Sequence, residues 1–344
     1  MDKHLLNKIL SNFEITGSLT SFKKISSGYI NDTFKIFTDG YPRYILQKIN
    51  SKVFKKPKDI FYNIDLIQKK SMNIGIILVD SKFNKPYIVI NDTEFWRLMD
   101  YEDGSQTFNN TTDPEIALEC GKVLSNFHIT FENTDLSKFK YILKDFHSLP
   151  SRIRQFNNAC KKLNKEKIKD FSDLINTINT FSEKFQIVYS SKLNKRLCHN
   201  DSKLNNILFD KNKKGLYLID IDTIMPGLIL YDFGDTVRTL VNPTSEEERD
   251  LKKIKFNKKM FVSFITGFKP TLLNIEQNER DLLPLSVALM PFMHGVRALT
   301  DHLNGNKYFE VSYPDQNLVR AKNLIKFAQI ALNNEKYMKK IINS

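Results

Sequence analysis

A polar segment in the middle of the chain limits what this sequence can fold into. Two short apolar runs, 207–209 and 216–221, read as buried strands, yet acids and asparagines stand within and directly beside them. A core strand excludes such side chains unless they serve a site, because burying an unpaired polar group costs free energy. We therefore expect residues 196–233 to form a functional site that the rest of the chain supports.

The first hundred residues have the pattern of a small sheet with one or two helices. Apolar residues at helical spacing predict a short amphipathic helix over 5–13. Strands are expected at 33–37 and 44–48, on either side of Asp39-Gly40, a dipeptide that favours a hairpin turn. The remaining elements predicted for this lobe, residues 1–100, are a helix over 58–70 and strands over 76–79, 87–90 and 94–99.

Beyond residue 100 the pattern is mainly helical. Asp113 suits a helix N-cap and Pro114 the first helical position, and apolar residues follow on one face. The change of pattern predicts an α+β fold of two lobes, with an N-terminal antiparallel sheet lobe (1–100) and a larger helical lobe (101–344). Further helices are predicted over 151–162, over 173–185, after a capping box at 245–248, over 283–303 and over 316–332.

The polar segment supplies the groups that phosphoryl transfer requires. Asp201 can accept a proton from an attacking hydroxyl or orient it, and Lys203 can neutralise charge on the moving phosphoryl group. Asn206 and Asp220 offer the oxygen ligands that Mg²⁺ prefers. This pattern predicts a phosphotransferase. The alternatives are an ordinary polar loop and a kinase-like fold that binds without catalysis.

The same residues match a known catalytic loop. His199-Asn200-Asp201 followed by Asn206 resembles the His-x-Asp-x-x-x-x-Asn loop of aminoglycoside phosphotransferases and choline kinases, relatives of the protein kinases. The resemblance implies a two-lobed protein-kinase-like fold, ATP and Mg²⁺ bound between the lobes, and phosphorylation of a small-molecule hydroxyl. In this loop His199 is expected to hold the backbone by hydrogen bonds rather than to transfer protons.

A closer resemblance, to the bacterial N-acetylhexosamine 1-kinases, extends along nearly the whole chain. It implies transfer of the γ-phosphoryl group of ATP to the anomeric hydroxyl of an N-acetylhexosamine, which gives the sugar 1-phosphate. The catalytic loop marks only the superfamily, whereas the strings over 27–33 and over 219–223 with 231–235 are fairly specific to this branch. The matching strings are residues 27–33, 45–50, 219–223 running into 231–235, and 296–301 through 317–320.

By this resemblance the turn over 28–33 covers the ATP phosphates, with Gly28, Asn31 and Thr33 as nucleotide-binding residues. The turn has one glycine where protein kinases have three. Phosphate binding is therefore expected to depend more on Asn31, Thr33 and metal than on a close backbone cradle. The alternative is a plain hairpin turn.

Lys48 stands on the following strand, where the resembled kinases place a lysine or arginine that holds the ATP phosphates. An exposed strand lysine is the alternative interpretation. Its acidic partner stays open between Asp59 and Asp65. The segment 94–101 is expected to be the hinge whose backbone meets adenine.

The expected site is completed by four residues that follow the second apolar run in the sequence. Asp222 is interpreted as a substrate contact or a second metal ligand, because two unpaired buried carboxylates repel each other unless a cation or hydroxylated ligand lies between them. A capped turn is the alternative. The resemblance implies that Asp232 supports the catalytic loop and that Asp235 and Arg238 reach the substrate.

The C-terminal string mixes arginine, aspartate, tyrosine and histidine, which are donors suited to sugar hydroxyls and an acetamido group. The resemblance implies that Arg297 and Tyr308 contact the sugar. For Asp301 and Arg320 a structural ion pair is an equal alternative.

The charge of this region bears on the acceptor. Arg238, Arg297 and Arg320 favour a neutral or acetylated sugar, because a cationic acceptor needs an acidic or aromatic pocket. The same machinery with another sugar, an amino alcohol or an aminoglycoside as acceptor is the alternative.

Composition adds weaker expectations about partners. Lys plus Arg number 52 and Asp plus Glu 39, and this net charge of +13 makes a basic nucleic-acid-binding protein the distant alternative. No nucleic-acid motif accompanies the lysines, which read as a solvated surface. The three cysteines have no metal spacing, and no uninterrupted apolar run of membrane-spanning length occurs. We expect a cytoplasmic protein, a monomer or weak dimer, with no membrane or nucleic-acid partner.

Overall fold

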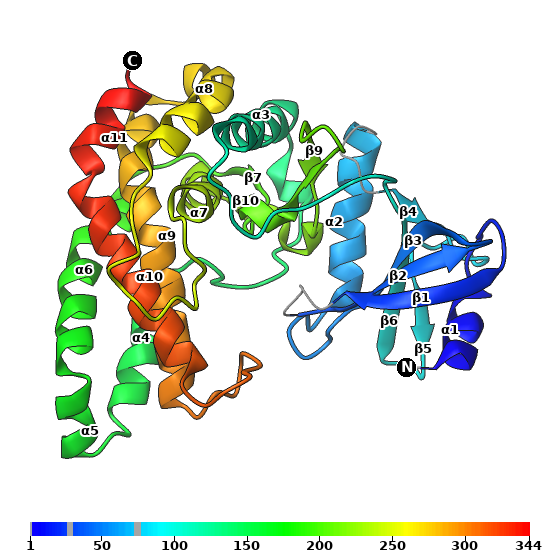
Figure 1. Ribbon diagram of the computed structural model, residues 1–344, viewed down its shortest axis with the longest axis horizontal. Coiled ribbons are helices and arrows are strands. Elements are labelled where there is room, and N and C mark those ends of the chain that lie inside the picture. The colour runs from blue at the N-terminus through cyan, green and yellow to red at the C-terminus, as the bar shows by residue number, and fades with distance from the viewer. Residues whose placement is uncertain (1, 26–29, 72–76) are drawn as a thin grey trace.

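The protein is described by a computed structural model, which covers residues 2–25, 30–71 and 77–344. Figure 1 shows a sheet lobe, coloured blue to cyan, beside a larger helical lobe, coloured green to red. The predicted two-lobed α+β fold is confirmed. The bounds of the sheet lobe's elements are α1 Lys3–Leu10, β1 Leu19–Ile25, β2 Asp32–Thr38, β3 Tyr41–Lys48, α2 Pro57–Lys70, β4 Leu78–Val79, β5 Ile88–Ile90 and β6 Glu94–Asp100.

The sheet is antiparallel, with strand order β1-β2-β3-β6-β4 and β5 paired to β6. The hairpin expected at Asp39-Gly40 joins β2 to β3, and both residues have a positive φ, of 52° and 85°. Glycine adopts this backbone without strain, and aspartate tolerates it better than most residues. This turn fixes the register of the two strands that lead to the cleft.

The two faces of the sheet have different neighbours, because alternate residues of a strand point to opposite sides. Leu46, Trp96 and Leu98 share a small core with α1. On the other face Gln47 of β3 stands opposite Arg97 of β6. That second face is the one whose side chains reach the larger lobe.

Helix α2 belongs to the sheet lobe in sequence but packs with the larger one. Its Ile60, Ile64 and Ile67 lie in the main hydrophobic core together with residues of the helical lobe. The amide of Asn63 donates to the carbonyl oxygens of Lys140 and Ile224, each at 2.9 Å. Figure 1 accordingly shows α2 between the two lobes.

The helical lobe surrounds α9, which packs against α4, α6, α7, α10 and α11. Four short strands form two antiparallel pairs, β7 with β10 and β8 with β9. The strands are β7 Arg196–Cys198, β8 Ile207–Phe209, β9 Gly215–Leu218 and β10 Met225–Gly227. The helices are α3 Pro114–Thr130, α4 Leu149–Cys160, α5 Lys165–Asp170, α6 Ser172–Ser190, α7 Ile229–Val241, α8 Lys258–Asn274, α9 Gln277–Leu303, α10 Gln316–Asn333 and α11 Glu335–Ile342.

One predicted helix is absent from the described chain: no helix follows the capping box at 245–248, and α8 begins only at Lys258, with Asn257 as its cap. The polar groups of this segment have tertiary partners instead. Glu246 pairs with Arg238 and Arg320, and the amide of Asn323 donates to the carbonyl oxygens of Ser245 and Glu248. The segment is therefore held by side chains of α7 and α10 rather than by helical hydrogen bonds.

Helix α9 is long and apolar enough on average to cross a membrane, but 83% of that stretch is buried inside the protein. Its apolar residues face the surrounding helices rather than solvent. This is the composition of a core helix, since a helix that is apolar all round must be covered by something.

Candidate functional site

The strand pairs bring the two halves of the polar segment together. Pairing of β7 with β10 places Cys198 opposite Met225, and pairing of β8 with β9 places Ile207 opposite Leu218. The loop from His199 to Asn206 and the turn from Ile219 to Thr223 therefore lie side by side. We call the first of these the His199–Asn206 loop.

Asp232, on the first turns of α7, fixes the backbone of this loop. Its carboxylate is fully buried and accepts hydrogen bonds from the backbone N–H groups of His199 at 2.8 Å and Asn200 at 2.7 Å. The hydroxyl of Ser202 donates to the backbone carbonyl of Asp232 at 2.8 Å. The imidazole of His128 lies 3.2 Å from the same carboxylate. A charged acceptor with several donors holds a loop more firmly than neutral groups do.

His199 joins this loop to the turn from Ile219 to Thr223. Its Nδ1 accepts from the backbone N–H of Asp201 at 3.2 Å, so its Nε2 carries the proton and donates to the carbonyl oxygen of Ile219 at 2.9 Å. Asn200 has a positive φ of 63°, and its amide donates to the carbonyl oxygens of Cys198, Thr223 and Met225. These bonds leave neither side chain facing the cleft.

Asp201 presents a carboxylate between two local donors. Its Oδ2 accepts from Nζ of Lys203 at 3.0 Å and from Nδ2 of Asn206 at 2.9 Å. Burial alone would lower the pKa of Lys203, but Asp201 and Asp220 outweigh it and raise that pKa above its usual value. Lys203 is therefore a permanent cation beside the carboxylate.

Asp220 begins a short 3₁₀ turn and has a left-handed backbone, with φ of 59°. Burial, reinforced by the charges of Asp222 and Asp201, raises the pKa of Asp220 to about 6. A cation at this carboxylate would relieve that repulsion. Asn206 uses its Nδ2 for Asp201, which leaves its carbonyl oxygen as a second hard ligand. The two side chains thus fit a Mg²⁺ ion, although the described residues contain no group of three or more His, Cys, Asp or Glu that could hold a metal by themselves.

Asp222 is bound by the other lobe. One carboxylate oxygen pairs with Nη1 of Arg97, and the other accepts from Nδ2 of Asn31 at 2.7 Å. Arg97 also donates to the side-chain oxygen of Gln47 from Nε at 2.9 Å and from Nη2 at 2.6 Å, and Gln47 in turn donates to Thr33 at 2.9 Å. These groups form a polar network between the lobes, in which protein side chains occupy both oxygens of Asp222.

Lys48 lies outside this network. It shares the α1-facing side of the sheet with Trp96, pairs with Glu94 of β6, and has its Nζ 5.7 Å from the centre of the Trp96 ring. Its partner is thus on a neighbouring strand rather than at Asp59 or Asp65 on α2. The strand register explains this, because Gln47 rather than Lys48 faces the larger lobe. Gly28, the other predicted phosphate-loop residue, lies outside the described residues.

Asp235 and Arg238 form a buried ion pair on α7, with Nε of Arg238 2.7 Å from Oδ1 of Asp235. Burial opposes ionisation of Asp235, but Arg238 and His294 outweigh it and hold the pKa of Asp235 well below its usual value. Nη1 of Arg238 lies 2.5 Å from Glu246. Within the described chain Oδ2 of Asp235 has no hydrogen-bond partner. Asp235 is therefore a buried charge with one oxygen left to accept a bond.

Arg297 of α9 lies among three aromatic rings, which we call the Arg297 cluster. Its guanidinium carbon is 5.2 Å from the ring centre of Phe146 and 5.8 Å from those of Tyr308 and Phe309. Asp301 fixes the adjacent loop, because its carboxylate accepts from the backbone N–H groups of residues 307, 308 and 309. Arg320 pairs with Glu246 at 2.9 Å. Tyr308 is 52% exposed.

Sequence reasoning missed four polar residues of this region. Each has its partner on another element of the fold, so only the tertiary structure assigns it. Arg97 interrupts the apolar run from Phe95 to Met99, which was the available signal that it faces a polar site. The missed residues are Arg97, Gln47, Glu246 and His294, whose Nε2 lies 3.3 Å from Asp235.

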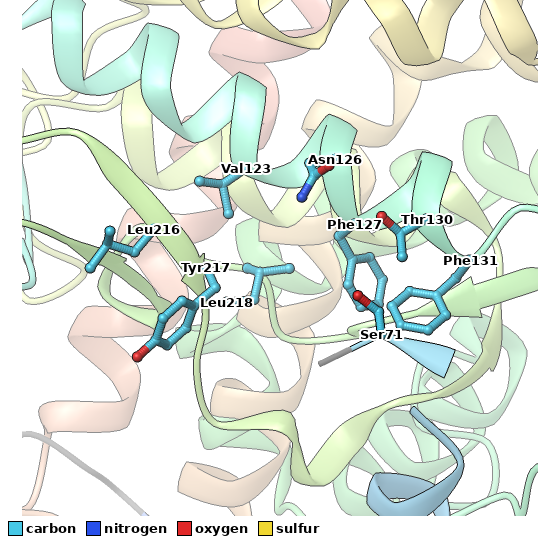
Figure 2. A pocket seen from close by; sticks show the side chains of 9 residues that line it. All are labelled: Ser71, Val123, Asn126, Phe127, Thr130, Phe131, Leu216, Tyr217 and Leu218. Carbon is cyan, nitrogen blue, oxygen red and sulfur yellow. The ribbon is translucent and has the colours of Figure 1, made fainter. Parts of the chain in front are cut away.

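The pocket in Figure 2 is separate from these groups. It lies between α3, β9 and the end of α2, with a volume of about 30 Å³. Figure 2 shows Asn126 and Phe127 of α3 on one side and Tyr217 and Leu218 of β9 on the other. None of the acids or cations of the candidate site lines this pocket, so the pocket is not part of that site.

Solved structures with the same fold include several kinases. A microcompartment-associated aminopropanol kinase has a TM-score of 0.67 at 14% identity, covering 98% of this chain and 99% of its own. A spectinomycin phosphotransferase, solved with ADP and spectinomycin, gives 0.68 at 13%, covering 96% and 99%. A choline/ethanolamine kinase family protein from Mesorhizobium loti gives 0.60 at 12%, covering 99% of both chains. At these identities the likeness concerns the fold.

The family itself follows from the sequence match. Residues 21–255 match the model of the family described as Phosphotransferase enzyme family. This range is more than half of the chain and contains most of β1, all of β2 to β10, the His199–Asn206 loop and α7. The chain therefore belongs to the phosphotransferase enzyme family.

Proposed function

We propose that this protein is an ATP-dependent kinase that transfers the γ-phosphoryl group to a hydroxyl of a small molecule. The observation that carries the proposal is the arrangement of Asp201, Lys203, Asn206 and Asp220 on two adjoining loops, of which Asp232 holds the first and His199 joins the second to it. Structures with this fold are described as complexes with ADP, AMP and GDP, which supports a nucleotide as the donor.

In this proposal Asp201 orients the acceptor hydroxyl or removes its proton while the phosphoryl group transfers in line. Lys203, which is held as a cation, neutralises the charge of the transferring group. Asn206 and Asp220 would hold Mg²⁺, which when bound neutralises phosphate charge. Asn31 and Thr33 stand at the start of β2, where they would adjoin the nucleotide phosphates.

The acceptor site in this proposal lies among Asp235, Arg238, Arg297 and Tyr308. Asp235 and Glu246 are matched by Arg238 and Arg320, and the third acid of the region, Asp301, accepts from backbone N–H groups. Arg297 adds a further positive charge. Such a region disfavours a cationic acceptor and suits a neutral, hydroxyl-rich one. Together with the resemblance of the sequence strings, this supports an N-acetylhexosamine phosphorylated at its anomeric hydroxyl.

One observation favours a second candidate. The unpartnered Oδ2 of Asp235 is a buried anionic acceptor, and it would also suit an ammonium group. An amino alcohol or aminoglycoside acceptor would use that atom. The aminopropanol kinase and the spectinomycin phosphotransferase with this fold are described as acting on such molecules.

The test is ADP release from Mg²⁺-ATP over a panel of acceptors: N-acetylglucosamine, N-acetylgalactosamine, glucose, galactose, choline and kanamycin. The proposal expects turnover on the acetylated sugars. The matched control is the methyl glycoside of the accepted sugar, which lacks only the free anomeric hydroxyl and should give no turnover.

Other outcomes decide between the candidates. Turnover of the methyl glycoside would place phosphorylation at another hydroxyl of the same sugar. Turnover of choline or kanamycin alone would replace the sugar with a cationic acceptor. Absence of ADP release across the panel, together with no binding of ATP by calorimetry, would contradict the kinase proposal itself.

A further inference from the structure

The strand register raises the question of which cation of the sheet lobe meets the nucleotide. A kinase cleft needs positive charge facing the phosphates. Position 48 carries a lysine, but it turns toward α1 and pairs with Glu94. On the face that meets the larger lobe, Gln47 of β3 is uncharged, and Arg97 of β6 stands directly opposite it.

Arg97 is buried as a charge between the lobes, with 1% of its side chain exposed. Burying a guanidinium is costly unless it is paired and hydrogen-bonded. Here Asp222 and Gln47 satisfy that requirement. Within the described chain these bonds engage three of its five N–H donors. The remaining donors can meet an anion without loss of the existing bonds.

The network places Arg97 where three segments expected around the phosphates meet. Asp222, with which Arg97 pairs, follows Asp220, the proposed metal ligand, by two residues. Gln47, which accepts from Arg97, donates a hydrogen bond to Thr33. Asn31 donates to the same carboxylate, that of Asp222, as Arg97 does. Asn31 and Thr33 belong to the segment that the sequence predicts to cover the phosphates. One guanidinium is thus tied to both halves of the cleft.

We propose that Arg97 supplies the positive charge that the sheet lobe offers to the phosphates of the nucleotide, held in place by Asp222 and Gln47. The planar fork of arginine suits phosphate oxygens better than a lysine does at a fixed position. This inference rests on the proposed function, since it needs a nucleotide as ligand. It replaces Lys48 in the role that the resemblance implied.

The experiment measures ADP and adenosine binding by calorimetry in EDTA, so that any secondary effect on a metal site is removed. Arg97→Gln should weaken ADP binding about 10- to 100-fold, the range for losing charge-assisted bonds. Adenosine, which lacks phosphates, should bind with unchanged affinity. Arg43→Gln, which removes an exposed arginine from the same sheet, is the matched control and should leave both affinities unchanged.

A purely neutralising role for Arg97 is tested by a double variant. Arg97→Gln alone leaves the Asp222 carboxylate to repel phosphate, whereas Arg97→Gln with Asp222→Asn removes both charges. Under the proposal the double variant still binds ADP weakly. Recovery of wild-type ADP affinity would overturn it, because the arginine would then serve only to balance Asp222. Arg97→Lys covers the case in which Arg97→Gln fails to fold, and it should bind ADP more tightly than the double variant.

Lys48→Met tests the competing assignment. Lys48→Met should weaken ADP binding less than Arg97→Gln does. An equal or larger loss of ADP affinity would assign the contact with the phosphates to Lys48 instead. These outcomes are separable from the proposed function. If the wild-type protein binds neither ADP nor ATP, the kinase proposal falls and this inference with it. If the wild-type protein binds ADP and Arg97→Gln binds it equally well, only the inference about Arg97 falls.

Discussion

The His199–Asn206 loop and the Arg297 cluster are built in opposite ways. In the loop, side chains hold the backbone, and the donors and acceptors that do so are buried. In the Arg297 cluster, one cation lies among aromatic rings on a loop that is partly open to solvent, and Tyr308 is 52% exposed. The first arrangement fixes the positions of the loop's backbone and carboxylate atoms, whereas the second can accept other side chains at the same positions.

Under the proposed function, this difference separates the residues of the chemical step from those that choose the acceptor. A change in the loop should damage transfer to every acceptor, because the same carboxylate serves all of them. A change in the Arg297 cluster should alter the binding of one class of acceptor and leave turnover nearly intact. Substitutions in each region can therefore break or sharpen the contrast.

Asp201→Asn should give the largest effect. Loss of the general base lowers kcat by about 10²- to 10⁴-fold. The amide keeps the shape of the side chain and one oxygen for Lys203 and Asn206, so the fold should persist. The measurement is kcat with each accepted substrate, with thermal unfolding as the control. Near-wild-type turnover, or a loss confined to one acceptor, would contradict both the role of Asp201 and the contrast between the two regions.

Asp232→Asn should lower the free energy of unfolding by about 2–4 kcal/mol, because the amide presents an N–H to one of two buried backbone donors. Turnover should fall with every acceptor as the loop loses its support. Chemical denaturation measures the first effect and steady-state kinetics the second. Ser202→Ala is the matched control, since it removes one bond to the carbonyl of Asp232 and should cost about 1 kcal/mol. Equal stabilities of the two variants would show that the carboxylate is not the anchor.

Contacts within the His199–Asn206 loop could be anticipated from the sequence, whereas the contacts between the two lobes could not, for a physical reason. The contacts of the His199–Asn206 loop join residues two to five apart, as in Asp201 with Lys203 and Asn206, so their spacing records the geometry. Asp222 meets Arg97 across 125 positions, and no local pattern records that pairing. Fold class likewise follows from the change between strand and helix patterns, which each segment carries by itself.

One wrong prediction and one unexpected side-chain orientation show where local reasoning ends. A capping-box pattern at 245–248 predicted a helix, but Glu246 meets Arg238 and Arg320 instead, because ion pairs with two other helices outweigh a weak local preference. Lys48 lies one residue from the position that faces the larger lobe, and a shift of one residue reverses the face of a strand. Both outcomes depend on tertiary neighbours.

Asp220→Ala should raise the Mg²⁺ concentration for half-maximal activity about tenfold or more, since the proposed site then keeps only Asn206 as a protein ligand. Because the chemical groups of the loop remain, activity should return in part at high Mg²⁺. The measurement is a metal titration at fixed ATP with each accepted substrate. Asp170→Ala removes an exposed acid at the end of α5 and serves as control. An unchanged titration curve would count against Asp220 as a ligand.

Arg297→Ala should have the smallest effect and the most selective one. It removes the guanidinium that is proposed to contact the acceptor, and loss of one such polar contact predicts an increase in acceptor KM of about three- to thirtyfold. Both kcat and the KM for ATP should stay within about threefold, because Asp201 and the nucleotide side are untouched. Tyr308→Phe keeps the ring and removes only the hydroxyl, so a smaller rise in KM would assign the effect to the ring face and an equal rise to a hydrogen bond with the acceptor. A fall in kcat matching that of Asp201→Asn would instead join the cluster to the reaction centre and end the separation of the two regions.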